Sequence, residues 1–316
     1  MPIPSDKPLV ALIGAANLDI AAHAQAPLLL GDSNPGRIQC SPGGVARNVA
    51  ENLLRLGLDA RLISVLGDDA FAAVLRQSAA AIGLDLSACT SLAGQRTATY
   101  VSLHGTDGDM GVAVNDMGIL EQLTPQRLAP HRALLQRAAL WVLDCNLRPD
   151  TLAWLCAAAA AQAAPLFAEA VSVAKCAKLL PHLGQLHLLK ANRLEAQALT
   201  DQAIATPQDA VAAAQALQRR GVQQVVISLG AEGAAWCDAA GRSGHQGVRP
   251  VQVASATGAG DAMLAGLVQG HLQGLGLAAS LDWAMACAEL TLSSTFANSP
   301  DLGVAAVRAR LSNPHL

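Results

Sequence analysis

A threonine, two glycines and an aspartate stand together late in the chain, directly before an apolar, alanine-rich stretch that predicts a helix: Thr257-Gly258-Ala259-Gly260-Asp261. Glycines at a helix start let backbone N–H groups converge on an anion, and the helix dipole adds partial positive charge there. A carboxylate would repel a bound phosphate, but it fits a base that accepts the proton of an attacking hydroxyl. An ordinary helix with Asp261 in its first turn is the alternative, and the local sequence leaves both interpretations open.

Two further polar pairs follow predicted strands. The apolar run Leu9–Gly14 predicts a buried strand, and Asn17 and Asp19 come just past its end, where ligands bind in open α/β sheets. Alternate residues of an extended segment share a face, so this pair could meet a sugar's hydroxyls, although an Asn/Asp turn explains it equally well. Asn192 and Glu195 follow a later strand, three apart at a helix start. They could hold Mg²⁺ through water, form a capping box, or do both.

Glycines mark two more places where a ligand can approach the backbone. Gly43 and Gly44 open a predicted helix, and Asn48 lies one turn inside it, where its amide can bond to the same ligand. A second glycine loop ends a later strand and could lie along a nucleotide, although glycine turns after strands are common: Ser228, Gly230 and Gly233.

Several other enzyme classes are excluded by missing motifs. The chain has no GxxxxGK[ST] segment, which excludes P-loop NTPases, and no GxGxxG after its first predicted strand, which argues against a Rossmann dehydrogenase. HExxH and GxSxG are also absent, so zincins and the usual α/β-hydrolases are excluded.

Apolar runs and helical patterns alternate along most of the chain. Strands are predicted at 60–66, 139–144, 166–168, 186–189 and 224–229, and helices at 71–82, 125–137, 151–161, 193–199 and 208–220. This alternation indicates an α/β fold with a mostly parallel sheet, in a single domain spanning residues 1–316. Residues 96–104 instead alternate with a period of two and turn back into 110–114, which predicts a hairpin. With the segment after the first strand it predicts a small β-rich lid formed by about 17–40 and 95–116.

Composition sets the protein class. Of the 316 residues, 52% are hydrophobic and only 14% charged, and the net charge of −3 gives no electrostatic reason to expect nucleic acid or an anionic membrane as a partner. The seven cysteines are scattered and never spaced as CxxC, which favours reduced thiols. The N-terminus lacks a signal peptide's pattern, and no apolar run is long enough to span a bilayer, so we expect a cytoplasmic protein.

The order of these motifs is more specific than any one of them. NxD after the first strand, GGxxxN at a helix start, NxxE, GxxG after a strand and then TGAGD together resemble the ribokinase-like (PfkB) family of sugar and nucleoside kinases, over nearly the whole chain. The resemblance implies a three-layer α/β/α core with a small lid. Within the family the sequence is most similar to the pseudouridine kinases, on these segments: 32–36, 43–48, 115–117, 144–146 and 190–196.

The resemblance implies roles for the substrate-side residues. Asp261 would deprotonate the ribose 5′-hydroxyl, and the backbone before it would form the anion hole: Thr257, Gly258, Ala259 and Gly260. Asp19 would hold the ribose 2′- and 3′-hydroxyls, helped by Asn17, Gly43, Gly44 and Asn48. The candidates for reading the base are Ser33, Asn34, Thr99, Asp116 and Lys175. Closure of the lid would exclude water and limit ATP hydrolysis.

The resemblance also implies ATP and Mg²⁺ as cofactors. Asn192 and Glu195 would organise the metal through water, and the nucleotide would be lined by Asn192, Ser228, Gly230, Gly233, Thr257, Gly258 and Gly260. Three positions depart from the family pattern. Ser255 replaces an acidic or amide residue that often helps to hold a monovalent cation, which leaves activation by K⁺ open. Ala191 replaces a common proline, and Glu169-Ala170 stands where relatives tend to show Asp-Pro.

We therefore expect an ATP-dependent kinase for the 5′-hydroxyl of pseudouridine, acting in the degradation of this nucleoside. The alternatives are a related kinase for another nucleoside or for ribose, and a sensor that binds a nucleoside without catalysis. The partner is expected to be this small molecule, with no nucleic acid and no membrane. An exposed edge on a small β lid would also allow a homodimer through the lid.

Overall fold

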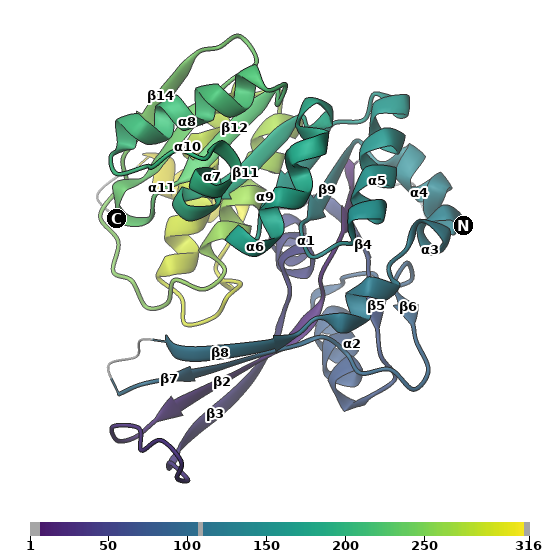
Figure 1. Ribbon diagram of the computed structural model, residues 1–316, viewed down its shortest axis with the longest axis vertical. Helices are drawn as coiled ribbons and strands as arrows, with labels where there is room; N and C mark the ends of the chain where they lie inside the picture. Colours follow the sequence, from purple (N-terminus) through teal and green to yellow (C-terminus); the bar gives the residue numbers. More distant parts are fainter. Residues whose placement is uncertain (1–6, 107–109, 313–316) are drawn as a thin grey trace.

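The structure, a computed structural model, describes residues 7–106 and 110–312 (Figure 1). Its larger sheet has eight strands: β1 Leu9–Ile13, β4 Asp59–Ile63, β9 Leu140–Asp144, β10 Leu166–Glu169, β11 Leu188–Asn192, β12 Gln224–Ser228, β13 Ala234–Cys237 and β14 Ser243–Gln246. Their order is β14-β13-β12-β11-β10-β9-β1-β4, and only β13 and β14 run antiparallel to their neighbours. The prediction of a mostly parallel sheet is confirmed.

Helices cover both faces of this sheet. One face carries α1 Val45–Arg55, α2 Ala70–Ile82, α9 Ala259–Leu272, α10 Leu277–Leu292 and α11 Val304–Ser312. The other carries α3 Pro125–Leu128, α4 Arg132–Arg137, α5 Pro149–Gln162, α6 Val173–Cys176, α7 Arg193–Thr200 and α8 Pro207–Arg219, with 3₁₀ turns at Gly118–Gln122 (η1), Ala129–His131 (η2), Ala177–Gln185 (η3) and Gly230–Glu232 (η4). Across the described ranges, none of these helices is both long and apolar enough to cross a membrane.

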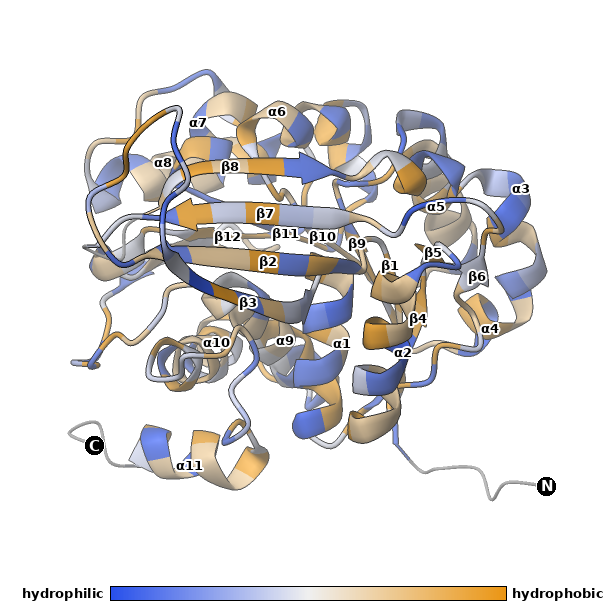
Figure 2. Ribbon diagram, turned by 90° about the horizontal axis from the view of Figure 1, so that it is seen from below, coloured by the Kyte–Doolittle hydropathy of each residue, from blue (hydrophilic) through white to orange (hydrophobic). Residues whose placement is uncertain are grey.

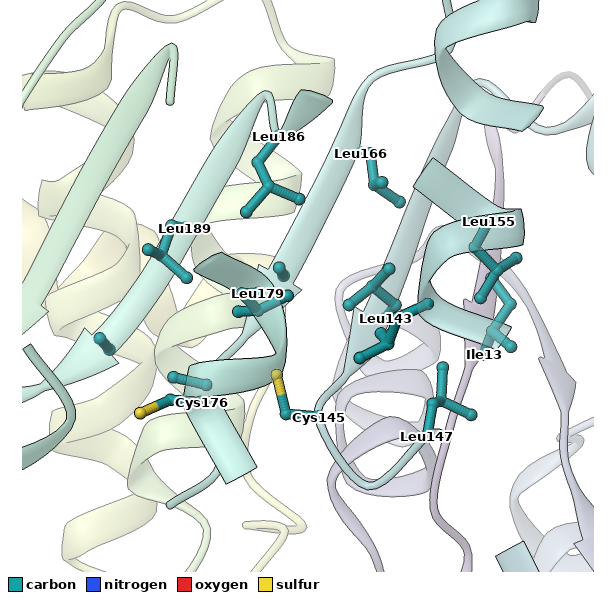
Figure 3. Packing of buried hydrophobic residues seen from close by; sticks show 14 of the residues in the cluster. Ile13, Leu143, Cys145, Leu147, Leu155, Leu166, Cys176, Leu179, Leu186 and Leu189 are labelled. Atoms are coloured by element: carbon teal, nitrogen blue, oxygen red, sulfur yellow. The ribbon is translucent and has the colours of Figure 1, made fainter. Parts of the chain in front are cut away.

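The core is divided into two layers by the sheet. Alternate residues of β1 enter separate hydrophobic clusters, because successive side chains of a strand point to opposite faces. Ile13 faces the α5 side, where it joins Leu143 and Leu155 (Figure 3), while Leu12 faces the α1 side. The parallel strands are apolar on both faces for this reason.

A second, four-stranded sheet projects from one end of the molecule (Figure 1). Its strands are β2 Asn17–Ala24, β3 Gly36–Gly43, β7 Thr99–His104 and β8 Met110–Asp116, in the order β3-β2-β7-β8. We call this sheet the lid. Both hairpins are antiparallel, and a parallel pairing of β2 with β7 joins them. The predicted β7–β8 hairpin is confirmed; residues 107–109 of its turn lie outside the described ranges.

Two predicted elements are interrupted. The predicted strand 60–66 breaks at Ser64, whose hydroxyl donates to the Gly14 carbonyl at 2.6 Å, and the chain then leaves as β5 (Val65–Leu66) to pair with β6 (Thr90–Ser91). The predicted helix 125–137 is divided into α3, η2 and α4, because Pro130 has no N–H to donate and its ring clashes with the preceding turn. Elements β13, β14, α10 and α11 were not predicted from the sequence.

Candidate active site

Polar and acidic side chains gather at the carboxyl ends of the parallel strands, the end from which the lid projects. Asp144, Glu169 and Asn192 are the last residues of β9, β10 and β11, and Asn17 follows β1 by a short turn. Ligands bind at this edge in open α/β sheets, so the location itself supports a binding site.

Asp261 meets Asn48 here, although 213 residues separate them in sequence. The Nδ2 of Asn48 donates to Oδ2 of Asp261 at 2.9 Å. Burial raises the pKa of Asp261 to about 6; Asn48 and Lys190 oppose the rise, whereas the charges of Asp144 and Asp19 add to it. Such a carboxylate is ionised at neutral pH and still basic enough to accept a proton from a hydroxyl.

The loop before Asp261 is shaped by its glycines. Gly258 has φ 82° as the N-cap of α9, where no side chain caps the helix. A Cβ at Gly258 would overlap the carbonyl of Ala297, and one at Gly260 would lie 2.8 Å from Nζ of Lys190. The N–H groups of the first helical turn have no intrahelical acceptor. The arrangement can therefore receive an anion beside a basic carboxylate.

Asp19 lies close to two residues that were predicted to join it, Asn17 and Gly43. The Nδ2 of Asn17 donates to its Oδ1 at 2.5 Å, and a Cβ on Gly43 would overlap the carboxylate. Burial raises the pKa of Asp19 to about 6, with Asn17 and the charge of Arg47 opposing the rise. Gly44, with φ 98°, packs against the backbone of Ala15 so closely that no Cβ would fit. The side chains can accept hydrogen bonds from vicinal hydroxyls.

Asp144 is a functional candidate that the sequence did not assign a role. Its Oδ2 accepts from the N–H groups of Ala15 at 2.7 Å and Ala46 at 3.2 Å, and its Oδ1 accepts from Asn146 at 2.8 Å. These bonds hold the loop after β1 against the start of α1, and so place the glycine pair. An acidic residue ending an otherwise apolar strand was the signal available in the sequence.

A buried cluster of charges lies behind Asp261. The Nζ of Lys190 pairs with Oε1 of Glu169 at 3.0 Å, and both side chains are buried. Burial raises the pKa of Glu169 to about 8, and the nearby charges of Glu195 and Asp261 push it the same way, whereas Lys190 opposes this rise. Although burial alone would lower it, Glu169, Glu195 and Asp261 together raise the pKa of Lys190. A lysine inside an apolar strand was the missed signal for this cluster.

Asn192 and Glu195 form the capping box that the sequence offered as one alternative. The side chain of Asn192 accepts from the N–H of Glu195 at 2.9 Å, and Oε2 of Glu195 accepts from the N–H of Asn192 at 2.7 Å. Over the described ranges, no three His, Cys, Asp or Glu side chains are arranged to hold a metal ion directly. Among the residues that the structure describes, Oε2 of Glu169, buried nearby, has no hydrogen-bond partner. This donor set fits a Mg²⁺ that keeps its waters and binds mainly to phosphate.

The second glycine loop lies beside Asn192, because Ser228 pairs with it in the register of β11 and β12. Gly230 and Gly233 have φ of 62° and 92°, and a Cβ on Gly233 would overlap the carbonyl of Gln246. Ser255, at the start of the loop before α9, accepts a hydrogen bond from the N–H of Thr257 at 3.2 Å. The second glycine loop therefore lies beside the capping box of Asn192 and Glu195.

The lid candidates are not brought together with Asp19. Thr99 pairs in register with Leu18, so both it and its partner Asp116 project from the opposite face of the lid. Ser33 and Asn34 lie at the far tip, where Asn34 bonds to Leu29 and Asp32. Lys175 lies outside the lid. Its Nζ donates to Oδ1 of Asn146 at 2.6 Å, beside the ends of β9 and β10.

Three lid residues that the sequence did not single out share the face of Asp19. Ser41, Tyr100 and Asn115 occupy its row across the lid. Burial raises the pKa of Tyr100, and the charge of Asp19 raises it further, which agrees with their proximity. The period of two along each strand, counted from Asp19, was the signal that would have selected this face.

Comparison with known proteins shows the family of the chain. The pfkB family of carbohydrate kinases matches residues 7–302. The chain is 38% identical to a pseudouridine kinase from Escherichia coli K12 over 98% of both chains, and 36% identical to an uncharacterised sugar kinase of that strain, YeiI, over 92% of this chain and 80% of the other. An Arabidopsis thaliana ribokinase complexed with ribose and ATP has the same fold, with a TM-score of 0.86 at 22% identity over 97% of this chain and 99% of the other. The chain belongs to the pfkB family of carbohydrate kinases and is a phosphotransferase that acts on an alcohol group.

Proposed function

We propose that the protein transfers the γ-phosphoryl group of ATP to the ribose 5′-hydroxyl of pseudouridine, in the degradation of that nucleoside. The observation that carries the kinase chemistry is the Asp261 carboxylate at an uncapped, glycine-lined helix start, on the same edge of the sheet as Asp19. The pseudouridine assignment is supported by likeness to the E. coli pseudouridine kinase along nearly the whole of both chains.

In the proposed reaction, Asp19 accepts hydrogen bonds from the ribose 2′- and 3′-hydroxyls and so orients the 5′-hydroxyl. Asp261 takes the proton of the 5′-hydroxyl while the 5′-oxygen bonds to the γ-phosphorus. The bond between the γ-phosphorus and the β-phosphate oxygen breaks at the same time, and ADP is released. The N–H groups from Gly258 to Gly260 stabilise the charge on the transferring phosphoryl oxygens. Lys190, 3.0 Å from Glu169, adds positive charge beside them.

The nucleotide would lie along the two glycine loops, bordered by Asn192, Ser228 and Gly230. When bound, Mg²⁺ neutralises phosphate charge, and Asn192 and Glu195 would orient its waters. The orphaned Oε2 of Glu169 is a third oxygen available to that hydration shell.

A coupled ATP assay with pseudouridine, uridine, adenosine and ribose tests the proposal. We expect kcat/KM to be highest for pseudouridine. Higher turnover of ribose or adenosine would refute pseudouridine as the substrate, although the protein would still be a kinase. No turnover of any of the four compounds would favour a nucleoside sensor. Running the assay with and without K⁺ decides the cation dependence that Ser255 leaves open.

We also propose a homodimer formed through the lid. The face of the lid opposite Asp19, which we call its outer face, exposes four apolar residues: Ile38, Val101, Val112 and Val114, with 74%, 41%, 55% and 68% of each residue accessible. Figure 2 shows hydrophobic residues along β7 and β8. Such a patch is unusual on a monomer. Light scattering should give twice the mass of one chain, and Val114→Lys should give a monomer; a monomeric unmodified protein at micromolar concentration would refute the dimer.

A cytoplasmic location is the last part of the proposal. All seven cysteines are free thiols, and five of them are buried. Thiols persist in this form in a reducing compartment.

A further inference from the structure

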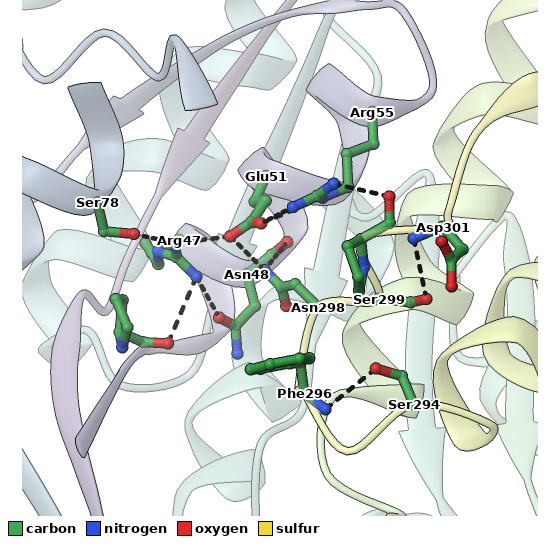
Figure 4. A network of polar contacts seen from close by, with 12 residues as sticks. Arg47, Asn48, Glu51, Arg55, Ser78, Ser294, Phe296, Asn298, Ser299 and Asp301 are labelled. Carbon is green, nitrogen blue, oxygen red and sulfur yellow. Dashed lines mark hydrogen bonds and ion pairs between the residues drawn. The ribbon is translucent and has the colours of Figure 1, made fainter. Parts of the chain in front are cut away.

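Arg47 is a buried, charged side chain to which the proposed reaction gives no role. It stands in α1 directly before Asn48 and is 6% exposed. Figure 4 shows it in a polar network with Ser78, Asn48 and Glu51. Its Nη2 pairs with Oε2 of Glu51 at 2.6 Å and donates to Oγ of Ser78 at 3.2 Å, and its Nη1 donates to Oδ1 of Asn48 at 3.1 Å.

The amide of Asn48 is therefore held at both ends. A guanidinium can only donate, and an ionised carboxylate can only accept. Arg47 can face only Oδ1 of Asn48, and Asp261 can face only Nδ2, so the two charged neighbours select one orientation of the amide. Without Arg47, the amide could turn its oxygen toward Asp261 and repel it.

We propose that Arg47 is a positioning residue that acts through the amide of Asn48 to hold Asp261 ready to accept the substrate proton. This inference rests on the proposed function for the role of Asp261. A second contact links Arg47 to the sugar side, since its Nη1 also lies 3.4 Å from the carbonyl of Pro42 in β3, next to Gly43.

The other charges around Asp261 come from different elements. Lys190 in β11 opposes the rise of its pKa, Asp144 at the end of β9 and Asp19 in β2 add to it, and Glu169 in β10 also lies close. The hydrogen bond from Asn48 is the largest influence that favours the ionised form. A change at Arg47 should reach Asp261 through that bond.

Arg47→Met and Arg55→Met form a matched pair. Arg55 binds the other oxygen of Glu51 at 2.6 Å and the Pro300 carbonyl at 3.1 Å, but lies two turns beyond Asn48 in α1. In either variant Glu51 keeps one arginine. We expect Arg47→Met to lower kcat about tenfold and to move the acid limb of the kcat profile up by about one pH unit, which is the scale of one lost hydrogen bond to a charged group. Arg55→Met should leave the acid limb in place.

A double-mutant cycle tests the route. If Arg47 acts through Asn48, adding Arg47→Met to Asn48→Ala should move the limb no further. An equal shift in both backgrounds, or the same limb in Arg47→Met and Arg55→Met, would overturn the proposal. If Arg47→Met does not fold, Arg47→Lys keeps a charge beside Glu51 and should give an intermediate shift.

A readout without turnover separates this inference from the proposed function. The ¹³C signal of the Asp261 carboxyl, assigned by its loss in Asp261→Asn, should titrate at higher pH in Arg47→Met than in the unmodified protein. An unchanged titration would refute the positioning role even in a fully active enzyme. Turnover of none of the nucleosides would refute the proposed function, and the NMR titration would still decide the role of Arg47.

Discussion

Asp261→Asn is expected to lower kcat by about a thousandfold, within the range of roughly 10²–10⁴ that a general base contributes. Asparagine has nearly the same shape and can still accept the hydrogen bond from Asn48, so the site should keep its geometry. The dissociation constant for the nucleoside, measured by calorimetry, should change by no more than about twofold because the substitution removes an interaction made in the transition state. An enzyme that keeps most of its kcat would refute the base assignment.

The pH dependence follows from the same carboxylate. Asp261, with a pKa of about 6 in the free protein, must be ionised to accept a proton, so kcat/KM should fall about tenfold per unit below pH 6. Asp19 titrates in the same range and should add to the acid limb of kcat/KM. An acid limb that remained flat down to pH 5 would contradict both assignments.

Although Asp261→Asn should lower kcat, it should raise the stability of the folded protein at neutral pH. The folded pKa of about 6 lies above the ordinary value of 3.8, so the folded state binds the proton more tightly than the unfolded state does. The favourable contribution of this group is complete below pH 3.8 and is lost as pH rises through 6. At pH 7.5 the variant should therefore melt at a higher temperature than the unmodified protein, and the difference should shrink toward pH 4.

Gly258→Ala is expected to lower kcat about a hundredfold, as misplacement of a reacting group by about 1 Å can do. At φ 82° an alanine is strained, and its Cβ would overlap the carbonyl of Ala297, which is backbone and cannot move aside cheaply. The start of α9 must shift, and with it the N–H groups that we propose to bind the transferring phosphoryl group. The melting temperature should also fall.

Gly241→Ala is the matched control for that variant. Gly241 has φ 78°, but a Cβ there would meet nothing within 4 Å. It should lose only the roughly 1 kcal/mol of a left-handed residue, with kcat unchanged. If both variants lost the same stability and neither lost activity, the contact between Gly258 and Ala297 would have no catalytic importance.

The larger sheet could be predicted because its strands carry their own signal. Apolar runs such as residues 140–143 and 225–227 are buried on both faces, and that burial leaves a continuous hydrophobic stretch in the sequence. The predictions of one continuous helix over 125–137 and one continuous strand over 60–66 were wrong. In each case a single residue, Pro130 or Ser64, interrupts an element that the pattern of the surrounding residues favours.

The site was predictable residue by residue only where the family resemblance supplied the partners. Spacing along the chain cannot bring Asn48 to Asp261 across 213 residues. The sequence did not predict the pair of Lys190 with Glu169 or the contact of Arg47 with Asn48. Each of these residues lies in a strand or helix that the neighbouring residues already predict, so nothing in the local pattern pointed to a partner. For the lid, the tip and outer-face residues were chosen by composition, whereas the strand register determines which side chains face Asp19.

The parallel pairing of β2 with β7 joins the two hairpins into one sheet. If this sheet moves, it should rotate as a rigid body about its root. Strand β2 has eight residues, so at about 3.3 Å each it extends about 26 Å from its root at Asn17. A rotation of about 10° about that root would carry Ser33 and Asn34 through about 4–5 Å, but Asp19 through only about 1 Å. The proposed contacts of Asp19 with the ribose hydroxyls would thus persist through such a rotation, while contacts made near the tip would form and break.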